Sequence, residues 1–397
     1  MTRAEISSLL DALPVVSSHC HHAGADHHAG LTLNGLLGSS YAGWMAQPPA
    51  ETHEARAAFV DRLATNTYFT WLSHAVDELY GRGPIEPGSW DAIDAAIGEA
   101  HTDPEHHYRL LGEHCRYRFA VQDCYWDRGH DHGRPDLFRP TYRIDSWVSC
   151  FAPGVIDHDG NDLWADLGLE AGSLVDYLDL LDDHIAAAKA RGAVALKSAL
   201  AYERPVSFDR PLAAPAQRAF KARPDAVSSD DVLAFGDVVF HHCCRAAQRE
   251  GLPFQIHLGL GQISGSRPML FEPVIRAYPG VTFDLFHAGY PWTGESAGLL
   301  HNYPNVVADL CWLPLISTTA AVRALHEYLD VAGSSERILW GDDTWTGEEA
   351  YGALVAWRHV VATVLTERLE WGLLRESHLE PLAEKLMWRN GAAVFGG

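Results

Sequence analysis

The sequence predicts one parallel (β/α)₈ barrel with a long helical insertion after its first strand. Eight short apolar runs rich in β-branched residues occur along the chain, and amphipathic helical patterns separate most of them. No Pro/Gly/Ser-rich linker is long enough to divide these runs between two domains. A chain of 397 residues is long for an ordinary domain but fits a barrel with insertions. We therefore expect a single domain over residues 1–397.

The first strand is expected from Leu13 to Ser18, with Pro14 near its start. Residues 27–116 lack strand character, and the segment "ARAAFVDRLATNTYFTWLSHAVDELYG" within them repeats apolar residues every three or four positions, which predicts a helical insertion covering one face. The later segments "SLVDYLDLLDDHIAAAKARG" and "DDVLAFGDVVFHHCCRAAQREG" are also predicted helices, each closed by glycine. The other seven strands are expected at 118–126, 142–151, 193–200, 253–260, 281–289, 305–312 and 337–345.

Composition restricts the classes of function. Hydrophobic residues make up 47% of the chain and there are 13 tryptophans, enough for a large core. The first residues are too polar for a signal peptide, no apolar run reaches about 18 residues, and the seven cysteines form no C-x-x-C pair, so we expect a cytoplasmic protein that does not enter a membrane. A net charge of -22 opposes binding to nucleic acid and anionic lipid. The expected partner is a small-molecule substrate, and a homo-oligomer is left open.

Polar residues that end apolar strands point to a metal site. His19 and His21 follow the first strand, one residue apart, and in a barrel the carboxyl ends of all strands converge on one mouth. In a chain with 23 histidines an H-x-H pair also arises by chance, as at His130 and His132, and a strand-end residue can simply bond a loop or cap a helix. Several such positions at one end of a barrel nevertheless favour a divalent metal. The further positions are Lys197, His257, His287, Asp342 and Asp343.

This order of residues resembles the amidohydrolase superfamily of metal-dependent hydrolases. The segments "ALKSALAYERP", "PFQIHLGLG", "LFHAGYPW" and "ILWGDD" are similar to the amidohydrolase-related branch that contains the N-terminal half of fungal FluG-like and plant nodulin-like proteins. The long insertion after the first strand resembles that of uronate isomerase. The chain departs from many relatives at Ser17, where they have an acidic residue two positions before the first histidine.

The resemblance implies four metal ligands, His19, His21, His257 and Asp343. Asp343 is preferred to its neighbour Asp342 because relatives place the acid two residues after a glycine, here at position 341. The expected cofactor is a divalent metal, zinc first, with manganese or iron as alternatives and with one or two ions.

Two further residues have roles that the resemblance leaves open. His287 is either a metal ligand or a proton donor beside the ligands. Lys197 is either carboxylated, so that it bridges two metals, or a free ammonium group that binds an anionic group of the substrate.

The implied chemistry is hydrolysis. A metal lowers the pKa of bound water from about 15.7 towards about 7 and polarises a carbonyl, while Asp343 takes the proton and passes it to the leaving group. The expected substrate is a small carboxylate-bearing amide, ester or lactone. The expected substrate wall, in which an arginine would suit a carboxylate, consists of Tyr202, Arg204, Arg267, Tyr290, Trp292 and Trp345.

Two alternatives remain open. The same site could serve a decarboxylase or a sugar-acid isomerase without hydrolysis, or the protein could be a catalytically silent binding protein. Two other clusters are not expected to hold a metal: the histidines at 130 and 132, which belong to a solvated loop, and the run "HHCC" at 241–244, because adjacent residues on a helix point in different directions. His27 and His28 could line the entrance of the site, but their spacing does not require it.

Overall fold

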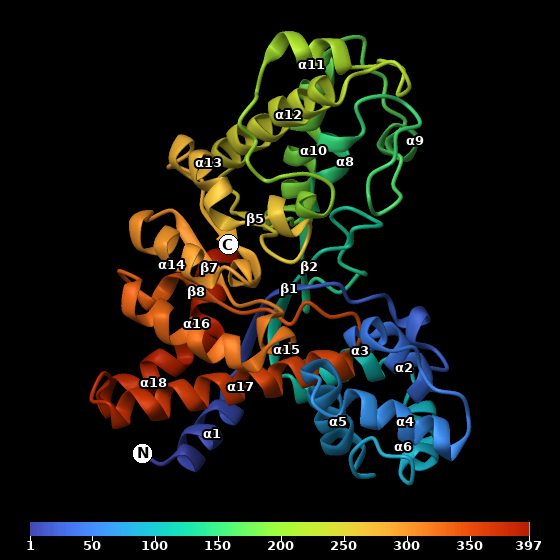
Figure 1. Cartoon of the computed structure of the whole chain (residues 1–397), viewed down its shortest axis with the longest axis vertical. Coiled ribbons are helices and arrows are strands. Elements are labelled where there is room, and N and C mark those ends of the chain that lie inside the picture. The colour runs from blue at the N-terminus through green and yellow to red at the C-terminus, as the bar shows by residue number, and fades with distance from the viewer. Residues whose placement is uncertain (397) are drawn as a thin grey trace.

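The computed structural model describes residues 1–396 and contains eight parallel strands that pair in sequence order. Backbone hydrogen bonds from Ser18 N to Trp340 O (3.0 Å) and from Asp343 N to His19 O (3.0 Å) join the first strand to the end of the last, so the sheet closes into the predicted barrel (Figure 1). The strands are β1 (Val15–Cys20), β2 (Tyr117–Gln122), β3 (Phe138–Arg143), β4 (Ala195–Ser198), β5 (Phe254–Ile256), β6 (Phe283–Leu285), β7 (Val306–Asp309) and β8 (Ile338–Leu339).

The interior of the barrel is filled in layers. At its floor Val16, Val121 and Val307, from three strands, pack with Phe395 of the C-terminal helix. Two residues further along β1, the Ser18 hydroxyl donates to Asp309 of β7, so the next layer is polar. The pairing of β1 with β2 then becomes irregular between Ser17 and Cys20. Such an irregularity re-aims side chains at the rim of a barrel, and here it allows His19 to reach the mouth.

Helices cover the barrel and one end of the molecule. Residues 21–116, all of them described, contain helices and no strand, as expected for the insertion. The helices are α1 (Arg3–Ala12), α2 (Leu33–Ser39), α3 (Tyr41–Met45), α4 (His53–Leu63), α5 (Thr67–Tyr80), α6 (Trp90–Ala100), α7 (His106–Arg109), α8 (Asp145–Ser149), α9 (Leu163–Leu167), α10 (Leu174–Ala190), α11 (Ala213–Ala219), α12 (Ser229–Glu250), α13 (Glu272–Ala277), α14 (Thr293–Asn302), α15 (Leu313–Ile316), α16 (Thr318–Val331), α17 (Gly347–Glu370), α18 (Glu376–Glu384) and α19 (Asn390–Phe395).

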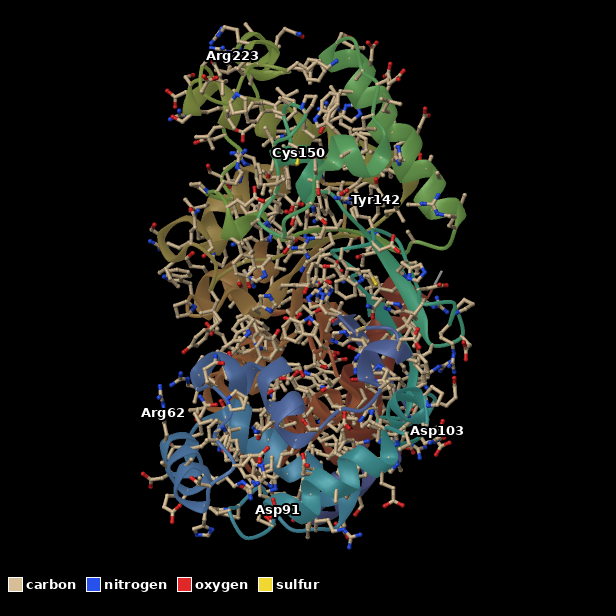
Figure 2. The ribbon with its side chains drawn as sticks, turned by 90° about the vertical axis from the view of Figure 1, so that its right-hand side faces the viewer. Arg62, Asp91, Asp103, Tyr142, Cys150 and Arg223 are labelled. Carbon is tan, nitrogen blue, oxygen red and sulfur yellow. The ribbon has the colours of Figure 1, made fainter. Side chains whose placement is uncertain are left out.

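The insertion has a small core of its own. Leu36, Phe59, Leu72 and Trp90, from four of its helices, are buried in one cluster that is separate from the barrel core. Helix α5 packs along α17, which fixes the insertion to the barrel (Figure 1). Figure 2 shows the insertion, marked by Arg62, Asp91 and Asp103, at one end of the molecule and the segment around Arg223 at the other.

The third strand was predicted in the wrong place. The sequence pattern favoured residues 142–151, whereas β3 is Phe138–Arg143 and the following residues Asp145–Ser149 form α8. Arg139 and Pro140 interrupt the apolar pattern of the true strand, and the apolar residues of α8 extend the apolar run that was interpreted as a strand. This shift places the side chain of Arg143, rather than a residue near 150, at the mouth of the barrel.

Two findings bear on the environment of the chain. No helix within residues 1–396 combines the length and the apolarity needed to cross a membrane. All seven cysteines are buried free thiols.

A buried carboxyl group at the start of α17 makes stability depend on pH. Burial raises the pKa of Glu349 to about 8 from 4.5, although the backbone N–H of Tyr41 donates to it (2.8 Å). Because this pKa is higher in the folded state, the neutral acid stabilises the fold fully below about pH 4.5, and the contribution is lost as the pH rises through 8.

Glu349→Gln is therefore expected to unfold at a higher temperature than the wild type at pH 9 and at a similar one at pH 5. Glutamine keeps the acceptor but cannot ionise, and the gain at pH 9 is expected to be a few kcal/mol. Thermal unfolding at both pH values measures this, with the exposed Glu54→Gln as control. Equal pH dependence in Glu349→Gln and the wild type would contradict the assignment.

Candidate active site

A cavity of about 240 Å³ lies at the carboxyl ends of the barrel strands. Five of the expected metal-binding and catalytic residues line this one cavity: His19, His21, Lys197, His257 and Asp343. They come from the ends of β1, β4, β5 and β8, so parallel strands bring together residues more than 300 positions apart. The other lining residues are Tyr41, Trp44, Tyr125, Arg143, His158, Asp159, Ala199, Tyr202 and Trp345.

The carboxylate of Asp343 faces both histidines of the H-x-H pair. Its Oδ1 atom is 3.1 Å from His21 Nε2 and 3.6 Å from His19 Nε2. Burial raises the pKa of Asp343, but the hydrogen bond and the charge of His21 outweigh it, so the net shift is downward and the group is an anion. The backbone of Asp343 is left-handed (φ 58°), which directs this side chain and not that of Asp342 into the cavity.

Neighbouring groups fix the orientation of two of the histidines. His21 Nδ1 is 2.8 Å from the backbone oxygen of Asp123 and donates to it, which leaves Nε2 directed at Asp343. His287 Nδ1 donates to Cys311 O (3.0 Å), so in a neutral ring His287 Nε2 accepts from His257 Nδ1 (3.0 Å). His257 Nε2 then carries a lone pair, and this buried atom has no hydrogen-bond partner.

The histidine nitrogens suit a metal. Burial, together with nearby positive charges, lowers the pKa of His19 and of His257 well below 6.5, so both rings are neutral and carry a free lone pair. Neutral imidazoles beside an ionised carboxylate are the donor set that zinc, manganese and iron prefer. The unpartnered His257 Nε2 is therefore the observation that fits a divalent ion to this site.

A buried arginine, Arg143, also lines the cavity, and the sequence did not reveal it. Arg143 contacts three carboxylates, those of Asp123 (2.7 Å), Asp145 (2.9 Å) and Asp159 (3.0 Å). Asp123 Oδ2 also lies 3.9 Å from His19 Nε2. Burial opposes the charge of Arg143, but these carboxylates raise its pKa overall, so the guanidinium holds Asp123 beside the first histidine.

Lys197 is the cation of the cavity that lacks such partners. Its side chain is 2% exposed, and Nζ lies 3.6 Å from the ring centre of Phe286. Among the described residues, no carboxylate comes within ion-pair distance of Nζ. Burial lowers the pKa of the amino group, because an unpaired ammonium is poorly solvated here. An anionic substrate group could provide the missing charge.

The expected substrate wall is only partly at the cavity. Tyr202 and Trp345 line it: Tyr202 lies 4.6 Å from His257 and Trp345 stacks on His21 at 5.7 Å, measured between ring centres. Arg204 instead pairs with Asp237 of α12.

The other three expected wall residues also lie outside the cavity lining. Arg267 pairs with Glu295 of α14 and lies beside Trp292. The N–H of Tyr290 donates to the backbone oxygen of His287 (2.9 Å). Both arginines proposed for substrate binding are thus already paired with carboxylates elsewhere.

The insertion supplies aromatic residues that the sequence did not identify. Tyr41 donates its hydroxyl to the backbone oxygen of Asp343 (2.7 Å), and Trp44 lines the cavity while remaining 58% exposed. Both residues lie in α3, far in sequence from any strand end. Their place in the cavity lining therefore becomes visible only from the position of α3 in the folded structure.

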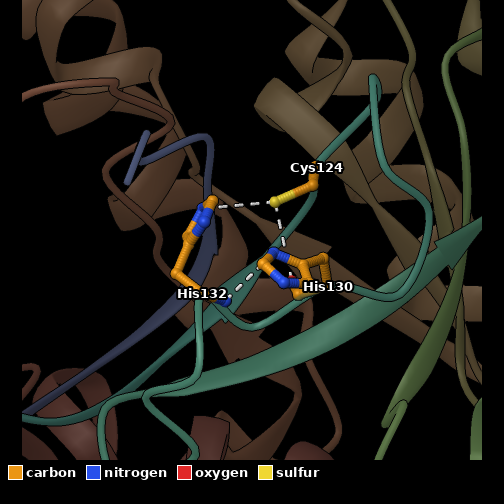
Figure 3. Close-up of side chains that lie close together, drawn as sticks. All are labelled: Cys124, His130 and His132. Atoms are coloured by element: carbon orange, nitrogen blue, oxygen red, sulfur yellow. Dashed lines mark hydrogen bonds between the residues drawn. The ribbon is translucent and has the colours of Figure 1, made fainter. Parts of the chain in front are cut away.

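The loop after β2 gathers three potential ligands (Figure 3). Cys124 Sγ lies 3.3 Å from His132 Nε2, and His130 Nδ1 accepts from the backbone N–H of His132 (3.2 Å). His132 Nε2 is also 2.7 Å from the backbone oxygen of His22 and donates to it. These hydrogen bonds account for the cluster, while His130 remains half-exposed, as expected for a loop residue.

Comparison with known protein families shows to which family the chain belongs. The model of the family described as Amidohydrolase matches residues 176–397, more than half of the chain. The chain belongs to the amidohydrolase family. The match covers β4 to β8 and therefore includes Lys197, His257, His287 and Asp343.

Individual relatives are more distant. Protein fluG of Emericella nidulans is 38% identical over 96 residues, which are 23% of this chain and 11% of that protein. Uronate isomerase of Nostoc punctiforme is 23% identical over 288 residues, 65% of this chain and 59% of that protein. The chain thus spans only part of either relative. The crystal structure of uronate isomerase from Thermotoga maritima superposes with a TM-score of 0.78 at 14% identity, covering 99% of this chain and 97% of that one, which shows a shared fold.

Proposed function

We propose that the protein is a metal-dependent hydrolase that cleaves an amide, ester or lactone bond in a small carboxylate-bearing substrate. The observation that carries this proposal is the position of Asp343, an ionised carboxylate 3.1 Å from His21 and 3.6 Å from His19, in a cavity that also contains Lys197. This arrangement combines nitrogen donors, a proton acceptor and a cation in a space suited to a small molecule.

His19, His21, His257 and Asp343 would hold the metal. A divalent ion there, zinc first by its ligand preference, acidifies water and polarises a carbonyl oxygen. His287 does not line the cavity, and it supports the proposal as a positioning residue, because its ring fixes the tautomer of His257.

The remaining residues have separate tasks. Asp343 accepts a proton from the attacking water and delivers it to the leaving amine or alkoxide. Lys197 binds the substrate carboxylate, since its ammonium group has no carboxylate partner. Trp44, Tyr202 and Trp345 form an aromatic wall that holds the substrate and excludes bulk water.

A sugar-acid isomerase is the second candidate. It is favoured by the similarity to uronate isomerase over 65% of this chain and by the helical insertion after β1. In that reaction Asp343 would move a proton between carbon atoms, and Lys197 would still bind the acid group.

A substrate screen distinguishes these reactions. Purified protein is incubated with carboxylate-bearing amides, esters and lactones and with uronic acids. The masses of the products are then measured by mass spectrometry. Hydrolysis adds the mass of one water to the summed products, isomerisation leaves the mass unchanged, and decarboxylation loses carbon dioxide. We expect water addition that disappears in His19→Ala/His21→Ala. Turnover restricted to uronic acids, or no turnover of any class, would refute the hydrolase.

A further inference from the structure

A second group of potential metal ligands, two of them buried and one half-buried, lies between the insertion and α17. His101 follows α6, His106 begins α7, and Glu348 lies in the first turn of α17. One ligand atom from each lies within 4.8 Å of the other two. His101 Nε2 is 2.6 Å from Glu348 Oε1. None of the three residues lines the cavity described above.

The carboxylate of Glu348 is an anion that is incompletely compensated. Its side chain is 0% exposed. Hydrogen bonds from His101 Nε2 (2.6 Å) and from the Tyr80 hydroxyl (2.7 Å) stabilise its ionised form. Both hydrogen bonds end on Oε1, while Oε2 has no partner. Within residues 1–396 no lysine or arginine pairs with it. A buried anion of this kind favours a cation nearby.

Neighbouring imidazoles are also unsatisfied. His28 and His107 are buried and stack with ring centres 4.0 Å apart, and neither nitrogen of either ring has a hydrogen-bond partner. The ring of His28 lies 6.3 Å from that of His101. Four unpartnered ring nitrogens beside a buried carboxylate are unusual, because buried polar atoms are nearly always hydrogen-bonded. In the group around Cys124 (Figure 3), hydrogen bonds occupy the potential ligand atoms. Here His101 and His106 are hydrogen-bonded too, the latter to the Tyr80 hydroxyl (3.2 Å), but Glu348 Oε2 and the rings of His28 and His107 have no partner.

We propose that His101, His106 and Glu348 bind a second divalent cation, zinc by ligand type, with His28 beside them as a further nitrogen donor. In a tetrahedral zinc site, ligand atoms about 2.0–2.2 Å from the ion lie about 3.5 Å from one another. Side-chain rotations would bring the three ligand atoms, which lie within 4.8 Å of one another, to this spacing. Two imidazoles and a carboxylate with a fourth nitrogen make a closed set, which suits a structural ion.

Such an ion would tie the insertion to the catalytic end of the barrel. His101 and His106 belong to the insertion, which also carries Tyr41 and Trp44 to the cavity. Glu348 lies five residues after Asp343. The ion would therefore fix the aromatic wall relative to Asp343. This inference is independent of the reaction that the cavity catalyses.

The test counts zinc in a protein that lacks the cavity ligands. In the full chain carrying His19→Ala, His21→Ala and His257→Ala, zinc is measured by elemental analysis after dialysis against buffered nanomolar zinc. We expect about one equivalent, falling to nearly none when His101→Asn and Glu348→Gln are added. The exposed His53→Ala in α4 is the matched control and should leave the zinc content unchanged. A triple variant without zinc, or a zinc content that survives the two added changes, would overturn the proposal.

A stability measurement on the triple variant tests the proposal even if the variant with the two added substitutions does not fold. The triple variant keeps His101, His106 and Glu348, so adding zinc to its metal-free form should raise its Tm and saturate at one equivalent, because an ion that binds only the folded state stabilises it. An unchanged Tm together with no bound zinc would show that these residues form no metal site.

Discussion

Asp343→Asn is expected to reduce kcat by about 10³-fold or more. Asparagine keeps the size and one oxygen of the side chain but cannot accept the proton, and loss of a general base typically costs 10² to 10⁴ in rate. The left-handed backbone at this position (φ 58°) is one that asparagine tolerates well, so the substitution should not strain the fold. The comparison requires kcat at matched metal occupancy, since the variant is expected to bind metal more weakly than the wild type.

The neighbouring Asp342→Asn is the informative control. Asp342 is fully buried and accepts hydrogen bonds from Ser17 (2.7 Å), Tyr117 (2.8 Å) and both the N–H (2.9 Å) and the hydroxyl (2.8 Å) of Thr344. We expect this variant to lose stability but to retain kcat in its folded fraction. If Asp343→Asn is active and Asp342→Asn is inactive, Asp342 is the proton acceptor. If both variants are active, neither aspartate is the proton acceptor.

Lys197→Met is expected to raise KM for a carboxylate substrate by about 10- to 150-fold, the loss of one charged hydrogen bond worth about 1.5–3 kcal/mol. Methionine fills a similar volume, and removal of a buried unpaired amine should not destabilise the fold. Metal content should stay the same. The control is Lys189→Met, a surface residue that contacts Glu250, which should leave KM unchanged.

The metal content of Lys197→Met also tests the other role for this residue. If the lysine is carboxylated and bridges two metals, the variant should lose one metal equivalent, and added short carboxylates should partly restore it. That result would show that Lys197 binds metal and does not bind the substrate carboxylate.

The sequence predicted the parts of the fold and the site that depend on local patterns. Apolar runs ending in His19, His257 or Asp343 are visible in the sequence because buried strands are continuously apolar and a polar residue at their end stands out. Asp123, which lies 3.9 Å from His19, carries the same signal after "FAVQ" and could have been found in this way. Arg143 was hidden by the misplaced third strand.

Other features depended on tertiary contacts that no local pattern encodes. Arg204 follows β4 and has the right charge, but the carboxylate of Asp237, 33 positions later in α12, pairs with it. Trp44 has an ordinary helical setting and reaches the cavity only because α3 packs beside the barrel mouth. The paired state of an arginine and the contribution of an insertion both require knowledge of which distant elements meet.

The joint between β1 and β8 has a consequence for the order in which the site can form. His19 and Asp343 are linked by a backbone hydrogen bond across the seam of the barrel, although 324 positions separate them in the chain. During synthesis the two histidines leave the ribosome long before their carboxylate partner exists. The proposed ligand set would therefore be unable to bind an ion while the chain is growing, because contacts this distant in sequence form late. Binding of the ion at the barrel mouth should therefore occur only after the barrel has closed, so the time course of ion binding should follow the last stage of folding.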